Sequence, residues 1–222
     1  MFGLRSCKYI RSIQPRKQAS ICILVYTVYM LDKTSAEQIA AAARSLLDRE
    51  GADAVTMRRV ASAVGLTAMA VYRHYPDRAG LLNKLANEGF EELASRLKGA
   101  RVSGDIEKRV IKVLDIFLKH ALDNPHLFEL MFLKPRQGSR RYPRDFKAGR
   151  SPTANLLVQL IEEGMETGQF RKDDVWEVVF QMGALMQGLV MLYVGGRMEM
   201  SPARFRGFCH RSVFRYMRGI RS

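Results

Sequence analysis

The chain of 222 residues has little cysteine and little histidine. Its three cysteines, Cys7, Cys22 and Cys209, form no CxxC pair and no even set. This excludes a framework of disulfides and indicates a reducing compartment. The four histidines include His120 and His126, which are six residues apart and have no cysteine or carboxylate at metal-ligand spacing. We therefore expect no metal site and no cofactor.

The common sequence motifs of enzymes are also missing. The chain has no HExxH, no GxSxG, no P-loop and no GxGxxG that follows a strand. These absences exclude the zinc proteases, the serine hydrolases and the nucleotide-binding enzymes that such motifs mark. We expect a protein that is not an enzyme.

Acidic residues are scarce relative to basic ones. Lys and Arg number 36 against 22 Asp and Glu, which gives a net charge of +14 and a pI near 10. Such a balance favours a polyanionic partner, either nucleic acid or an anionic membrane surface, although a solvated basic surface is the plain alternative. Much of the charge lies in three segments that carry no DNA motif: residues 1–30, residues 134–150 and the last helix.

Residues 1–31 differ from the rest of the chain. They combine five basic residues and no acid with an apolar run over residues 21–31, far shorter than the roughly twenty residues that span a bilayer. Three interpretations remain: a weak signal or anchor, a disordered tail, or translation started too early with Met30 as the true start. We favour the third, since Met30 lies just before a predicted helix, and leave this segment out of the fold.

From Thr34 the apolar spacing becomes helical. A capping-box pattern at Ser35 opens a first helix that should end near Gly51. Thr56 and Thr67 are predicted N-caps of two short helices separated by a tight turn, and the Pro76-Asp77 pair opens a fourth helix. Two short helices so joined have the geometry of a helix-turn-helix, which places its second helix in a major groove of DNA.

The second of these helices has side chains suited to DNA. Val71 and Tyr75, with Leu66 from the turn, should pack inward, which leaves the opposite face free. Small residues at its start allow close approach to base edges, and Met69 could meet a thymine methyl. Polar side chains nearby could reach phosphate oxygens. The expected DNA-binding residues are Thr56, Arg58, Thr67, Ala68, Met69, Tyr72, Arg73, His74 and Arg78.

Residues 34–97 resemble the DNA-binding domain of the TetR (tetracycline repressor) family of bacterial transcription regulators. The resemblance lies in AEQIAAAARSLLDREG, TMRRVASAVGLT and AVYRHYPDRAGLL. It implies that Thr67, Ala68, Met69 and Tyr72 face the groove, that His74 and Arg78 contact phosphates, and that Arg58 touches a base or the backbone. The family commonly has lysine where Arg78 stands, and glutamate or a similar residue near Gly80.

The remaining residues, 99–222, are predicted to be helical with short breaks. Helices should begin at Gly104-Asp105, Pro125, Ser151-Pro152, Asp173 or Asp174, and Pro202, and residues 134–150 should form a loop. HALDNPHLFELMF and QMGALMQGLVMLYVGG resemble, more loosely, the regulatory domain of the same family. This implies a dimer formed by the last two long helices, with Val179, Gly183, Leu185, Gly188, Leu189, Leu192 and Phe208 as candidate interface residues, or core residues in the plain alternative.

The resemblance also implies a small-molecule pocket among the middle helices. Flexible methionines suit an adaptable apolar cavity, although core packing explains each residue equally well. We expect an apolar or weakly polar effector of unknown identity. The candidate lining residues are Phe117, Phe128, Met131, Met165, Met182 and Met186.

The sequence thus predicts an all-α protein, with an N-terminal three-helix helix-turn-helix domain over residues 32–98 and a helical ligand-binding and dimerisation domain over residues 99–222. It predicts a cytoplasmic, homodimeric transcription regulator, a repressor released by a small molecule, that binds a roughly palindromic double-stranded operator. The competing class is a membrane-associated protein that uses residues 21–31 and the last helix, whose arginines alternate with phenylalanines. The resemblance to the TetR family favours a protein that does not bind a membrane.

Overall fold

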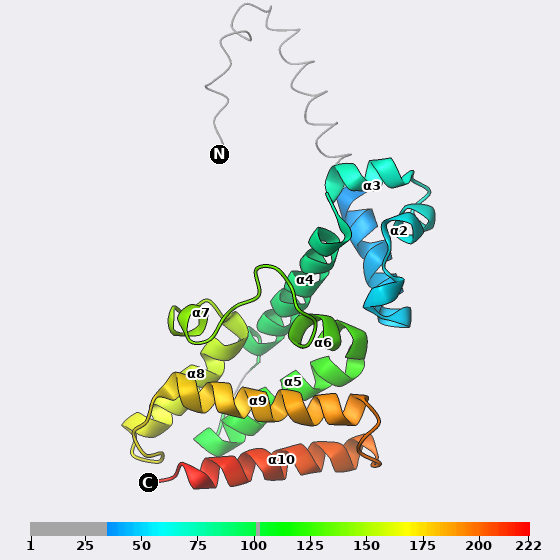
Figure 1. Ribbon diagram of the computed structural model, residues 1–222. Coiled ribbons are helices and arrows are strands. Elements are labelled where there is room, and N and C mark those ends of the chain that lie inside the picture. Colours follow the sequence, from blue (N-terminus) through cyan, green and yellow to red (C-terminus); the bar gives the residue numbers. More distant parts are fainter. Residues whose placement is uncertain (1–34, 101–102) are drawn as a thin grey trace, which may run out of the picture.

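The computed structural model describes residues 35–100 and 103–222, and these residues are helical with no strand among them (Figure 1). The predictions for residues 1–31 lie outside this part of the chain. A small N-terminal head comprises a helix over residues 35–50, the 3₁₀ turn η2 (Ala52–Ala54), α2 (Met57–Ala63) and α3 (Ala68–His74). The rest comprises α4 (Arg78–Lys98), α5 (Ile106–Asp123), α6 (Pro125–Phe132), α7 (Arg144–Lys147), α8 (Pro152–Glu166), α9 (Val175–Val194) and α10 (Pro202–Gly219).

The predicted helix starts in the head are confirmed by their caps. The side-chain oxygens of Thr56, Thr67 and Asp77 each accept a hydrogen bond from a backbone N–H three residues on, at 3.2, 3.2 and 2.6 Å. Each bond satisfies a donor that the first turn leaves unpaired. The first helix ends at Gly51, whose φ of 83° lies in the left-handed region. The turn between α2 and α3 is therefore fixed by local sequence.

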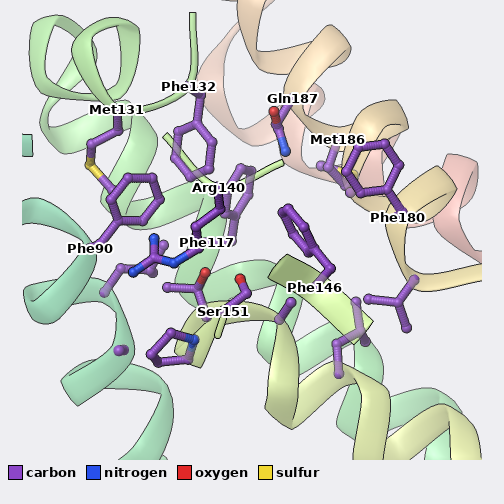
Figure 2. Close-up of a pocket in the computed structure, with 18 of the residues that line it drawn as sticks. Phe90, Phe117, Met131, Phe132, Arg140, Phe146, Ser151, Phe180, Met186 and Gln187 are labelled. Carbon is purple, nitrogen blue, oxygen red and sulfur yellow. The ribbon is translucent and has the colours of Figure 1, made fainter. Parts of the chain in front are cut away.

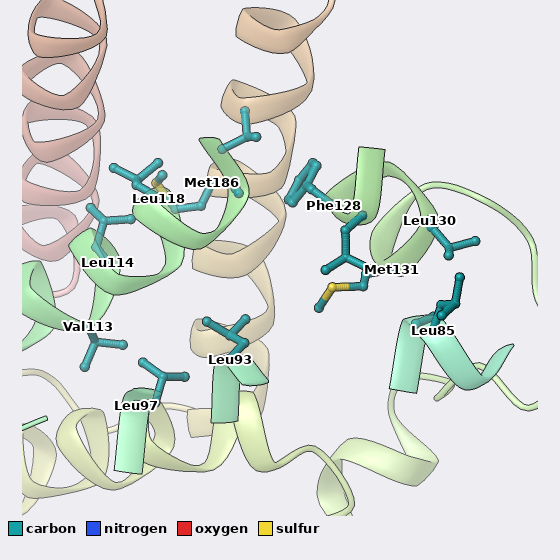
Figure 3. Close-up of a cluster of buried hydrophobic side chains, with 14 of the residues drawn as sticks. Leu85, Leu93, Leu97, Val113, Leu114, Leu118, Phe128, Leu130, Met131 and Met186 are labelled. Carbon is teal, nitrogen blue, oxygen red and sulfur yellow. The ribbon is translucent and has the colours of Figure 1, made fainter. Parts of the chain in front are cut away.

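Helix α4 joins the head to the rest of the molecule. Its first turns, with Leu81 and Leu85 fully buried, belong to the core of the head, and Leu93 and Leu97 near its end pack among α5 and α8 (Figures 1 and 3). Gly89 lies where α6 crosses α4. A Cβ at this position would come within 2.6 Å of the Met131 sulfur, so the crossing requires glycine.

The larger part is a helical bundle whose last two helices run antiparallel along one edge (Figure 1). Helices α9 and α10 are held together by the stacked rings of Tyr193 and Phe205, 4.1 Å apart, and by the Tyr216 hydroxyl, which donates to the Val178 carbonyl at 3.0 Å. The core between α4, α5, α6 and α9 is apolar (Figure 3). Its side chains are mainly those of leucine, valine, methionine and phenylalanine.

Two local predictions were wrong. Leu66, expected to pack inward, is 37% exposed in the turn between α2 and α3, where its amide donates to the Ala61 carbonyl at 2.9 Å. The segment of residues 134–150, expected to be a loop, contains the short helix α7. Its fold depends on Asp145, whose buried carboxylate accepts from the Arg141 amide at 2.8 Å and pairs with Arg144 and Arg150.

Candidate functional site

The exposed face of α3 is the first candidate site. Val71 is fully buried and fixes the helix in the head, whereas Met69 and Tyr72 are 74% and 46% exposed. Tyr75 closes the helix, and its hydroxyl donates to the Ala36 carbonyl at 3.3 Å. Burial raises the pKa of the Tyr75 phenol, which therefore stays neutral. A rigid helix thus presents an apolar and an aromatic side chain to solvent.

The other predicted groove residues surround this face. Thr67 and Arg73 are exposed, Ala68 is half-buried at the first turn of α3, and His74 is half-buried at its end. Thr56 and Arg58 are exposed at the start of α2. Helices α2 and α3 pack against each other in the head, so the elements that carry these residues are neighbours (Figure 1). A helix N-terminus with small residues next to aromatic and basic ones can meet base edges and phosphates.

Arg78 forms hydrogen bonds with backbone carbonyls of the head. Its Nε donates to the Val55 carbonyl at 2.7 Å and its Nη2 to the Ala52 carbonyl at 2.6 Å, while Asp53 lies 3.5 Å away. The guanidinium ties the start of α4 to the turn between the first two helices. The phosphate contact that the resemblance implies for Arg78 stays a prediction, and the side chain is 42% exposed.

The second candidate site is a cavity of about 780 Å³ between α4, α5, α6, α8 and α9, roofed by residues 134–146 (Figure 2). Cavities of this size hold drug-sized ligands. Four of the predicted lining residues, Phe117, Met131, Met182 and Met186, do line it. Phe128 and Met165 do not: Phe128 is 1% exposed and packs edge-on against Phe117, and Met165 lies against the core at the end of α8.

The cavity wall is more aromatic than the sequence indicated. Figure 2 shows Phe90 and Phe132 beside Phe117 on one side, and Phe146 and Phe180 on the other. Tyr142 stacks on Phe180 with ring centroids 4.2 Å apart. The prolines and glycines of residues 134–150 predict a loop and do not indicate that Tyr142 and Phe146 line a cavity. These two aromatic residues are four apart, but a single pair is too short a pattern to indicate a helix face.

Two arginines face the same cavity. The Cζ atoms of Arg140 and Arg136 lie 5.2 and 5.8 Å from the centre of the Phe90 ring. Arg136 also donates to the Leu130 and Met131 carbonyls in the last turn of α6, at 3.1 and 3.4 Å. Burial, and next the nearby charge of Arg140, lower the pKa of the Arg136 guanidinium.

The cavity and the head are linked by polar contacts. Arg44 of the first helix donates from Nη1 to the Glu92 carboxylate of α4 at 2.9 Å and from Nη2 to the Asn124 side chain at 3.1 Å. Asn124 directly precedes α6, whose Met131 and Phe132 line the cavity. Next to it, the His126 ring covers Gly51 so closely that a Cβ there would lie 3.3 Å from Nδ1. Helix α6 therefore contacts the cavity at one end and the head at the other.

The outer face of α9 is the third surface of interest. Leu192 is 36% exposed there, and Leu185, Gly188 and Leu189 are half-buried. Phe208 is half-buried on α10. Val179 and Gly183, also predicted for the interface, line the cavity instead, because they lie on the inner side of the helix. The exposed Met191 extends this apolar stripe at helical spacing, and the sequence did not single it out.

Two further features bear on the alternatives. Helix α9 is the one helix, within the described residues, that is long and apolar enough to cross a membrane, a property that it shares with core helices of soluble proteins. Among the same residues no group of histidine, cysteine and carboxylate side chains has the arrangement of a metal site. Cys209 is buried, which raises the pKa of its thiol to about 11 and keeps it protonated.

Comparison with known proteins agrees with this geometry. Residues 32–85 match the family model described as bacterial regulatory proteins of the tetR family, and residues 110–214 match that of the tetracyclin repressor-like C-terminal domain. Together the two models cover more than half of the chain. The chain belongs to the TetR family.

Relatives of this TetR family chain are named as DNA-associated proteins. It is 28% identical over 134 residues to the HTH-type transcriptional regulator Rv1816 of Mycobacterium tuberculosis, which covers 59% of this chain and 57% of the relative. It is 34% identical over 98 residues to the nucleoid occlusion factor SlmA of Vibrio vulnificus, which covers 43% and 49%. The chain thus spans about half the length of the curated relatives it matches.

A solved structure shows the same TetR fold. The putative tetR family transcription regulator from Shewanella sp. PV-4 superposes with a TM-score of 0.63 at 15% identity, covering 84% of this chain and 98% of that one. The TetR family and these neighbours are transcription regulators, not enzymes. DNA-binding transcription regulation is therefore the function of this chain at the level of its family.

Proposed function

We propose that this protein is a homodimeric repressor of transcription that leaves its operator when a small molecule occupies the cavity. The observation that carries the proposal is the coexistence of an exposed, capped recognition helix and an aromatic cavity, with α6 in contact with both the cavity and the head. The protein would act in the bacterial cytoplasm.

Base reading is assigned to the start of α3. Thr67 and Ala68 allow the helix to approach the groove, and Met69 supplies an apolar contact for a thymine methyl. Tyr72, Arg73 and His74 follow along the helix and hold the DNA backbone with Thr56 and Arg58 from α2. Arg78 supports this surface indirectly, because its hydrogen bonds hold the turn before α2 in place.

Two such helices are required for a two-fold operator. The apolar stripe on α9 is the surface that we assign to a second copy of the chain, with Phe208 of α10 at its side. A dimer with a two-fold axis would place the two recognition helices in successive major grooves, and the operator would then be roughly palindromic.

The test measures binding of the purified protein to the DNA upstream of its own gene, by fluorescence anisotropy. The wild type should bind this DNA in preference to an unrelated duplex, with an affinity that falls steeply as salt increases, because phosphate contacts release counterions. Tyr72→Ala should weaken specific binding by about tenfold or more, the cost of about one lost contact at the interface.

Tyr72→Phe is the matched control, since it keeps the ring and removes only the hydroxyl. It separates packing against the DNA from a hydrogen bond to phosphate, and circular dichroism checks that both variants remain folded. Vesicles of anionic lipid provide the competing arm. Binding to vesicles alone, or equal binding to every duplex, would overturn the proposal.

A further inference from the structure

The charge of the cavity is the starting point. Three basic residues line it, Lys134, Arg136 and Arg140, against a single carboxylate, the exposed Glu91. Lys134 is paired with Glu129 at 3.1 Å. The cavity wall therefore carries positive charge that the lining residues themselves do not neutralise.

Within the described residues, Arg136 and Arg140 form no ion pair, because the nearby carboxylates of Asp145 and Asp174 are paired with other basic residues. Asp145 is held by Arg144 and Arg150, at 3.2 and 3.4 Å, and Asp174 by Lys147. In the part of the chain that the structure describes, Arg136 and Arg140 have no carboxylate partner, and their known acceptors are carbonyl and amide oxygens. Two like charges beside one aromatic ring repel each other, and an anion between them would relieve that repulsion.

Arg140 is the better placed of the two for a ligand. Arg136 donates hydrogen bonds to carbonyls at the end of α6 and to the Asn83 side chain. Arg140 uses only its Nε, which donates to the Arg150 carbonyl, so both Nη atoms remain available to a ligand. A guanidinium with two free terminal nitrogens binds a carboxylate in bidentate fashion.

The start of α8 lies at the same part of the cavity wall as Arg140. Arg150 directly precedes Ser151, which is 4% exposed, lines the cavity and makes no capping hydrogen bond to its own helix. Figure 2 shows Ser151 near Arg140, with the aromatic rings beyond them. Pro152 and Thr153 also line the cavity, so the positive end of the α8 dipole is directed toward it.

We infer that the effector is an amphipathic organic anion, a carboxylate with an apolar body, whose charged group binds Arg140 at the start of α8 while its body lies among Phe117, Phe132, Phe146 and Phe180. This inference rests on the proposed function, since it names the ligand class of the same cavity. It replaces the apolar or weakly polar effector that the sequence indicated. A neutral ligand would leave both guanidinium groups without a counter-charge.

The test compares two fluorescent probes that share one apolar body. 8-Anilinonaphthalene-1-sulfonate carries an anionic group, and N-phenyl-1-naphthylamine lacks it. The wild type should bind the anionic probe about tenfold more tightly or better, as expected for one charge-assisted hydrogen-bonded pair. Arg140→Gln should abolish that preference without changing the affinity for the neutral probe, and Arg140→Lys should restore part of it.

Arg141→Gln is the matched control, because it removes the same charge from the same segment at a residue that does not line the cavity. 2-Naphthoate should displace the bound anionic probe, and its methyl ester should do so at least about tenfold less well. Equal affinity for the two probes in the wild type, or an unchanged preference in Arg140→Gln, would overturn the inference. No DNA is present in these measurements, so their failure leaves the repressor proposal standing, and a failure to bind operator leaves the ligand class standing.

Discussion

Arg78 contributes to the head through hydrogen bonds within the protein. Its guanidinium donates to the carbonyls of Ala52 and Val55 at the turn before α2, and the Ala52 carbonyl also accepts from the Val55 amide at 3.1 Å. Since α2 and α3 pack on this turn, the position of the recognition helix depends on it. The family resemblance implies a phosphate contact for this residue, which stays a prediction, and the structure adds partners within the protein.

We predict that Arg78→Ala lowers the free energy of unfolding by about 1–3 kcal/mol, measured by urea denaturation. The variant loses hydrogen bonds from a charged donor to two carbonyls, and the partial exposure of the side chain keeps the loss at the lower end of the usual range. Arg58→Ala, at an exposed position on α2, should change stability by less than about 0.5 kcal/mol. Equal stability of the two variants would return Arg78 to a role in phosphate binding alone.

The sequence could predict the caps and could not predict Arg78. Thr56, Thr67 and Asp77 each bond a backbone amide three residues away, so the pattern of residue types is sufficient to find them. The acceptors of Arg78 lie 23 and 26 residues before it, and only the folded head brings them together. Hydrogen bonds between residues that are close in the sequence can be predicted from it, whereas hydrogen bonds between distant elements cannot.

At the scale of elements, α6 is the part of the fold that connects the cavity to the head. Its last turns line the cavity, and its start is joined to the first helix through Asn124 and Arg44. A displacement of α6 by a ligand would therefore be transmitted to the head. The contact of α6 with α4 depends on Gly89, where a side chain would collide with Met131 and Leu127.

We predict that Gly89→Ala lowers the free energy of unfolding by about 1–3 kcal/mol, the usual cost of inserting a methyl group into a packed contact. The added Cβ would lie 2.6 Å from the Met131 sulfur and 3.0 Å from a Leu127 methyl, so these buried side chains of α6 have to move. Urea denaturation measures the loss of stability, and binding of the anionic naphthalene probe reports the altered cavity.

Gly183→Ala serves as the comparison, because its new Cβ would meet nothing nearer than the Gln187 side chain at 3.8 Å. Alanine favours a helix interior over glycine by about 0.5–1 kcal/mol, so this variant should be as stable as the wild type or more stable. A loss of stability as large in Gly183→Ala as in Gly89→Ala would show that the α4–α6 crossing is not specially tight.

Helices were easier to predict than the segments between them. Helices α5 and α9 begin directly after Asp105 and Asp174. Helices α6, α8 and α10 begin at Pro125, Pro152 and Pro202, as the sequence indicated. Residues 134–150 were different, because Tyr142 and Phe146 are a single pair in a mostly irregular segment and α7 depends on the buried Asp145. This segment supplies Arg136, Arg140, Tyr142 and Phe146 to the cavity wall.

At the scale of the whole molecule, the apolar stripe on the outer face of α9 is left exposed to solvent in a single chain. Met191 and Leu192 are 47% and 36% exposed on this face. Exposed apolar side chains grouped at helical spacing are typical of an interface. The sequence assigned Val179 and Gly183 to this surface because they share the helix, but its inner side faces the cavity.

We predict that the double substitution Met191→Glu/Leu192→Glu converts the wild-type dimer into a folded monomer, measured by sedimentation velocity. The two carboxylates would meet their symmetry mates across the two-fold axis and would have to be buried without partners. Affinity for a full operator should fall by about 10²-fold or more, because the second recognition helix no longer binds at high effective concentration. Affinity for an isolated half-site should stay the same.

Leu133→Glu is the matched control, since Leu133 is 40% exposed and lies just after α6, away from α9. This variant should remain dimeric and bind the full operator as the wild type does. If the α9 double variant also remained dimeric, the two copies would have to meet through another surface. The spacing of the two recognition helices, and with it the spacing of the operator half-sites, would then be set by that surface instead of by α9.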